Sequence, residues 1–114
     1  MTAGREGKKV QHKILIRVIG RTITLGDQGE KYAMAAQKGS DVIWYCNYPF
    51  SIMFEPGSHF RQLVTKKVKD VWTCGMHVPN KSEHFMYKYT IAVAKPNGGV
   101  LIMDPVLVPI PPEN

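Results

Sequence analysis

Cysteine and long apolar runs are scarce in this chain. The two cysteines, Cys46 and Cys74, allow at most one intramolecular disulfide. The longest apolar stretches, such as residues 42–46, are far too short to span a bilayer. The first residues, MTAGREGKKVQHK, lack the apolar segment and cleavage site of a signal peptide. We therefore expect a cytoplasmic protein with reduced cysteines, or a secreted or periplasmic one if a signal peptide has been removed.

Catalytic signatures are missing as well. The sequence contains no Gly-x-Ser-x-Gly motif, no phosphate-binding loop and no dinucleotide fingerprint. No two carboxylates are spaced as a general acid and base. Cys74 and His77 could pair a nucleophile with a base, but no third group of such a site can be identified. These absences predict a protein that is not an enzyme.

Acidic residues are rare at the N-terminal end. The chain has 15 Lys and Arg against 9 Asp and Glu, a net charge of +6. Residues 1–21 hold six of the cations and one acid, which leaves a net of 6 − 1 = +5 there and +1 elsewhere. A second basic run, residues 61–69, has no interleaved aromatic residues that could stack on bases. The charge therefore describes a basic arm and disfavours nucleic acid as the partner.

Short apolar runs separated by Gly and Pro turns fill most of the chain. Residues 13–19 and 84–94 alternate in the manner of strands, and residues 41–46, DVIWYC, are rich in β-branched and aromatic side chains. Residues 32–37 are rich in alanine and fit a weak strand or a short helix. With 114 residues and 44% apolar composition, one core is expected. We predict an all-β fold, a single antiparallel β-sandwich of about seven to eight strands.

The expected domain limits follow from the composition of the two ends. Residues 1–12 are expected to form a flexible basic arm, residues 13–110 the sandwich, and residues 111–114 a C-terminal tail. Proline in the sequence PIPPEN ends the last strand.

Five motifs follow one another between residues 32 and 110: KGSDVIWYCN, a Pro-Phe strand, YKYTIAV, a Gly-containing turn and MDPVLV. In this order they resemble cupredoxin-like β-sandwich domains. The resemblance implies a cupredoxin-like or immunoglobulin-like Greek key. Blue copper in that family is held by two His, one Cys and an axial Met. The stretch after the Trp-containing strand, NYPFS, has no His, and neither Cys nor His follows the Tyr-rich strand. The copper ligands are thus absent from the family's positions.

Soft and imidazole ligands occur elsewhere in the chain. Cys74 and His77 form a Cys-x-x-His pair ahead of the Tyr-rich strand, with Met76 and His84 nearby. Thiolate, imidazole and thioether groups suit copper(I) or zinc(II). Two ligands at this spacing do not define a site, so we expect no cofactor. A metal-binding or redox protein that uses these residues is the alternative function.

Aromatic side chains gather around one strand–turn–strand corner. Trp44 is expected in the core, whereas Tyr48, Phe50 and Trp72 are candidates for contact with a partner. The sequence therefore predicts a small interaction module that binds a protein partner or associates with itself. A third hypothesis is a carbohydrate-binding sandwich whose exposed Trp and Tyr form the platform.

Overall fold

The structure, a computed structural model, describes residues 10–26, 33–55, 62–80 and 86–111. These residues form strands joined by turns, and no helix occurs among them. The strands are β1 (Gln11–Ile19), β2 (Thr22–Leu25), β3 (Ala33–Gln37), β4 (Asp41–Cys46), β5 (Phe50–Phe54), β6 (Gln62–Leu63), β7 (Lys66–Val68), β8 (Val71–His77), β9 (Tyr87–Ala94), β10 (Val100–Met103) and β11 (Val106–Ile110).

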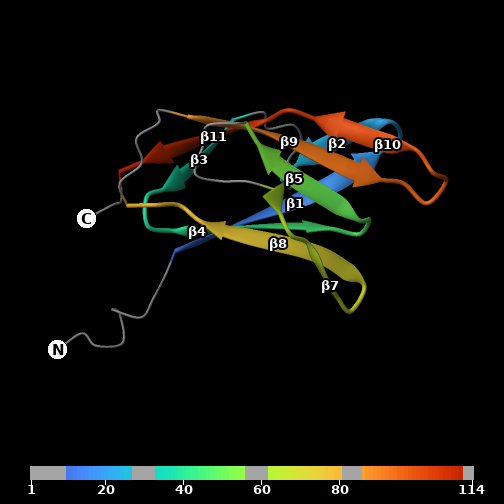
Figure 1. Ribbon diagram of the computed structural model, residues 1–114, viewed down its shortest axis with the longest axis horizontal. Helices are drawn as coiled ribbons and strands as arrows, with labels where there is room; N and C mark the ends of the chain where they lie inside the picture. Colours follow the sequence, from blue (N-terminus) through green and yellow to red (C-terminus); the bar gives the residue numbers. More distant parts are fainter. Residues whose placement is uncertain (1–9, 27–32, 56–61, 81–85, 112–114) are drawn as a thin grey trace.

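The strands are arranged in two packed sheets, which confirms the predicted all-β sandwich (Figure 1). Sheet A has the strand order β2-β1-β4-β8-β7. Sheet B has the order β3-β11-β9-β5-β6, and β10 pairs with the C-terminal half of β9. The described residues form more strands than expected because strands as short as β6 and β7 are too short to show an alternating pattern in the sequence.

The sheets are mixed, whereas the sequence predicted antiparallel ones. β1 runs parallel to β4, and β3 runs parallel to β11. The reason is the path of the chain between the layers. After the β1–β2 hairpin it crosses to sheet B as β3, then returns to sheet A as β4 in the direction of β1. Parallel neighbours need such a crossover, because a tight turn can only reverse a strand.

One apolar core fills the space between the sheets. β4 buries Val42, Trp44 and Cys46 on its inner face, and β9 buries alternate residues in the same way. Trp44 is fully buried and meets Tyr89 edge to face, with 5.6 Å between ring centroids. The expected position of Trp44 in the core is therefore confirmed.

Most of the expected N-terminal arm and C-terminal tail lies outside the described residues. β1 begins at Gln11, two residues before the strand expected from the sequence, while residues 1–9 of the expected arm lie outside the described residues. Pro111 follows the last strand, and residues 112–114 of the expected tail also lie outside them. No helix in the part of the chain that the structure describes is long and apolar enough to cross a membrane.

Candidate functional site

Strand β8 separates the two residues of the Cys-x-x-His motif. Side chains three positions apart on an extended strand point to opposite faces of the sheet. Cys74 accordingly lies in the core, 6% exposed, whereas the His77 side chain is 50% exposed on the outer face. Met76 is half-buried against the core, and His84 lies outside the described residues. The structure therefore places Cys74 and His77 on opposite faces of the sheet, and its described residues contain no group of three His, Cys, Asp or Glu side chains that could hold a metal.

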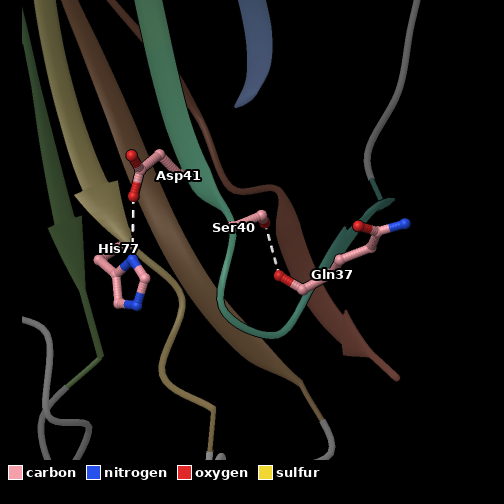
Figure 2. A network of polar contacts seen from close by, with 4 residues as sticks. All are labelled: Gln37, Ser40, Asp41 and His77. Atoms are coloured by element: carbon pink, nitrogen blue, oxygen red, sulfur yellow. Dashed lines mark hydrogen bonds and ion pairs between the residues drawn. The ribbon is translucent and has the colours of Figure 1, made fainter. Parts of the chain in front are cut away.

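His77 instead pairs with a carboxylate on the neighbouring strand. Figure 2 shows its Nδ1 facing Asp41 Oδ1 at 2.9 Å, and the two residues are register partners of β8 and β4. Just before Asp41, the Ser40 hydroxyl donates to the Gln37 carbonyl at 2.5 Å and closes the turn between β3 and β4. These contacts join strand ends, a structural role that accounts for His77 without a ligand.

Both cysteines are buried as free thiols. In the β4–β8 register Cys74 lies opposite Trp44, and Cys46 lies opposite Trp72, so the cysteines are diagonal neighbours. Burial raises the pKa of the Cys74 thiol to about 12. Burial also raises the pKa of Cys46, although the backbone N–H of Tyr48 donates to its Sγ and opposes the shift. Thiols kept neutral in this way are poor nucleophiles and poor metal ligands.

Two of the three aromatic candidates reach the surface. Tyr48 and Trp72 are half-buried, and both pack against the core. The Lys67 ammonium lies 5.9 Å from the centroid of the Trp72 ring, within the range of a cation–π contact. Phe50 is only 5% exposed because it faces inward at the start of β5, paired with Val93. A partner cannot reach its ring, so we leave Phe50 out of the candidate surface.

Tyr48 borders a hollow where two neighbouring strands differ in length. β4 ends at Cys46, opposite Ile16, whereas β1 continues to Ile19. Beyond Ile16 this edge of β1 has no β4 partner, and a hollow of about 190 Å³ opens beside it. Its lining consists of Leu15, Ile16, Arg17, Val18, Asn47 and Tyr48.

Apolar, aromatic and cationic side chains line this hollow or lie beside its lining residues on β1 and β4. Leu15 and Ile19 are 38% and 55% exposed, and the exposed Arg17 lies between them on the outer face of β1. Tyr45, half-buried, is the register partner of Leu15 on β4. We call the set Leu15, Arg17, Ile19, Tyr45 and Tyr48 the corner surface. It offers apolar contact area, two phenol groups and one guanidinium to whatever approaches it.

The β1–β2 hairpin that carries most of the corner surface is positively charged. Residues 10–26 contain Lys13, Arg17 and Arg21 and no acidic residue. A group of cations attracts anionic groups over a Debye length, about 8 Å at physiological salt. The nearest acidic residue in the strand register is Asp41 on β4, opposite Gln11 and diagonal to Lys13.

Sequence reasoning did not single out Leu15, Arg17 and Ile19. Residues 13–19 showed two alternating sets, Ile14, Ile16 and Val18 on one side and these three on the other. The one available signal was Arg17, whose charge marks its set as the outer face. The hollow itself depends on where β4 ends against β1, and that register is invisible in the sequence.

A larger hollow, of about 340 Å³, lies between β1 and β3. Apolar side chains form part of its wall, among them Ile14, Leu25 and Met34. His12 also lines it, but its Nε2 accepts a hydrogen bond from the Gln37 backbone N–H at 3.4 Å. The imidazole is therefore already engaged. Gln11 and Lys13 also line this hollow, but its described lining includes no Tyr or Trp side chain, in contrast to the hollow beside Tyr48.

Comparison of the chain with protein-family models and with curated proteins finds no match in either.

Proposed function

We propose that this chain is a small, non-enzymatic β-sandwich module that recognises a protein partner through the corner surface. The observation that supports the proposal is the hollow beside Tyr48, where β1 extends beyond the end of β4. Its lining combines Tyr48 and Arg17 with the exposed aliphatic residue Leu15, and Ile19 lies farther along the outer face of β1. Tyr and Arg are among the residue types that contribute most to binding energy at protein interfaces.

The partner is proposed to present an acidic segment with an apolar residue. Lys13, Arg17 and Arg21 give the hairpin its positive charge, and no acid within residues 10–26 offsets it. Complementary charge speeds association and aligns the partner, while apolar contact in the hollow slows dissociation. A partner segment would provide both the complementary charge and the apolar contact if its carboxylate bound Arg17 while an aliphatic or aromatic side chain entered the hollow.

We further propose that the sandwich is a cupredoxin-like domain without a blue-copper centre. Support comes from the order of the sequence motifs and from where each falls in the chain. The DVIWYC part of the first motif is β4, YKYTIAV lies within β9, and MDPVLV runs from the end of β10 into β11. An immunoglobulin-like arrangement is the competing description of the same sandwich.

The proposal is tested by selecting peptides from a random phage-displayed library on the full-length chain. We expect the selected peptides to combine Asp or Glu with aliphatic or aromatic residues. Arg17→Glu should weaken their binding about tenfold or more, because it replaces attraction by repulsion at the rim. Tyr48→Ala should weaken it comparably.

Lys88→Glu is the matched control, because Lys88 is an exposed cation on β9 of the other sheet. Its change in net charge equals that of Arg17→Glu, so general electrostatics affect both variants alike. Peptides that bind the Arg17→Glu and Lys88→Glu proteins equally well would refute the corner surface as the binding site. A selection without acidic peptides would refute the proposed partner chemistry.

A further inference from the structure

Within the described strands, one edge of β10 in sheet B is unpaired and apolar. Among the described strands it pairs only with β9, and its sequence VLIM carries no charge. Val100 and Ile102 are 60% and 66% exposed, both on the outer face. β2 of sheet A contacts β10 but forms no ladder with it. An uncharged, apolar edge strand of this kind is a template for pairing with another strand.

Two other edge strands of the sandwich, β7 and β6, are protected in the usual ways, whereas the edge strands β2 and β3 carry no charge, as β10 does. β7, at one edge of sheet A, carries Lys66 and Lys67, and Lys69 follows in the turn. β6, at one edge of sheet B, has only two residues. Lysine side chains and very short strands both discourage edge-to-edge contact. β10 has neither protection, and unlike β2 and β3 it exposes two large aliphatic side chains, Val100 and Ile102.

The hydrogen-bond pattern shows which backbone groups β10 offers. Lys95 N–H donates to the Gly99 carbonyl at 2.7 Å, so these two residues form a hydrogen-bonded pair of the β9–β10 hairpin. Such pairs alternate along an antiparallel ladder. Leu101 therefore bonds to β9, whereas the N–H and C=O groups of Val100 and Ile102 point away from it. These outward groups need a partner strand or water.

We propose that β10 pairs antiparallel with β10 of a second copy of this chain, joining the two B sheets into one continuous sheet. A two-fold axis through Leu101 places Val100 of each copy opposite Ile102 of the other. Each such pair then exchanges both of its N–H···O=C hydrogen bonds. The exposed Val100 and Ile102 side chains meet across the axis and cover one another.

Charge at the two ends of β10 favours this arrangement over a parallel one. Lys95 precedes the turn into β10, and Asp104 directly follows the strand. An antiparallel pair brings the Asp104 end of one copy towards the Lys95 end of the other, whereas a parallel pair would bring like ends together. The strand itself contains no charge that pairing would bury. A second copy can thus satisfy the outward hydrogen-bonding groups of this edge, and it brings ends of opposite charge together, although Asp104 also accepts a hydrogen bond from the Thr90 hydroxyl at 2.7 Å.

The test is sedimentation velocity of the full-length chain over a concentration series, combined with amide hydrogen exchange measured by NMR. We expect a reversible dimer in which the Val100 and Ile102 amides are protected. Dilution to the monomer should expose these two amides while Leu101 stays protected by β9. Ile102→Lys should weaken dimerisation at least about tenfold, because the two-fold axis doubles the substitution and brings two cations together. Val100→Lys should have the same effect.

Met53→Lys is the matched control. Met53 is 52% exposed on the outer face of the same sheet, but it lies on β5, on the far side of β9 from β10. Edge pairing leaves it untouched, whereas face-to-face packing of two B sheets would bury it. Circular dichroism melts of all variants confirm that these exposed positions tolerate lysine. A monomer at every concentration would overturn the proposal, and so would a dimer that Met53→Lys disrupts and Ile102→Lys does not. Either result leaves the corner surface on sheet A untouched.

Discussion

Tyr89 carries a hydroxyl group into the centre of the core. The residue is 1% exposed, and burial raises the pKa of its phenol to about 12 while the Trp44 indole opposes the shift. Within the described residues neither the Tyr89 hydroxyl nor the Trp44 Nε1 makes a hydrogen bond of normal geometry. A buried polar group without a good partner costs about 1–3 kcal/mol. The edge-to-face contact and the packing of both rings offset that cost.

Tyr89→Phe should therefore leave the free energy of unfolding unchanged or raise it by up to about 1 kcal/mol, because it removes the poorly paired hydroxyl and keeps the ring. Tyr89→Ala should lower it by about 3–5 kcal/mol through the cavity that it creates. Urea unfolding at pH 7, followed by tryptophan fluorescence, measures both. A loss above about 2 kcal/mol for the Phe variant would mean that the hydroxyl has a strong hydrogen-bond partner after all.

At the scale of elements, β8 shows how secondary structure decides the meaning of a motif. A Cys-x-x-His pair in a loop or turn can converge on one metal ion. The same spacing on an extended strand sends the two side chains to opposite faces of the sheet. Cys74 thus belongs to the core, and His77 belongs to the outer surface beside Asp41.

We expect zinc(II) to act on this protein independently of Cys74. Any shift in melting temperature that ZnCl₂ causes in the full-length chain should be the same in the Cys74→Ser variant, since that thiol lies inside the sandwich. Differential scanning fluorimetry with and without the metal measures the two shifts. A zinc-induced stabilisation that Cys74→Ser abolishes would show that β8 can open to bring the thiol to the ion.

Strands could be predicted where the pattern and the burial agree. β4 and β9 alternate clearly because one face of each lies in the core, and both appear where the sequence indicated. β3, AMAAQ, has weak strand propensity and is held in place by β11, a strand from the far end of the chain. The corner surface was missed for a related reason. It depends on register between β1 and β4, and tertiary pairing rather than local propensity decides that register.

For the whole molecule, the burial of ionisable groups should lower stability at alkaline pH. Burial raises the pKa of Cys74 from 9.0, and of Tyr89 from 10.0, to about 12 in both cases, and it also raises the pKa of Cys46. Above these ordinary values the unfolded chain loses protons that the folded chain keeps. Ionisation then favours the unfolded state, so stability present at neutral pH falls as the pH rises from about 9 towards 12.

The free energy of unfolding should therefore stay level up to about pH 8.5 and decline above pH 9, by at most about 1.4 kcal/mol per pH unit for each group, and the urea midpoint should fall with it. Cys74→Ala removes one of the three groups. The free energy of unfolding of this variant should decline less steeply with pH, whatever the substitution does to stability at pH 7. A midpoint that stays constant to pH 10.5, or a decline equally steep in Cys74→Ala, would contradict the assignment of the slope to buried thiols.

The parallel pairing of β3 with β11 constrains how the protein folds during its synthesis. Ala33 is in register with Val106, so this ladder joins the third described strand to the last one. Contacts so distant in sequence slow folding, because a long loop must close before the ladder forms. On the ribosome, β3 emerges well before β11 and cannot form this ladder until β11 has been made. β11 therefore completes this part of sheet B only after all ten strands that precede it in the described chain.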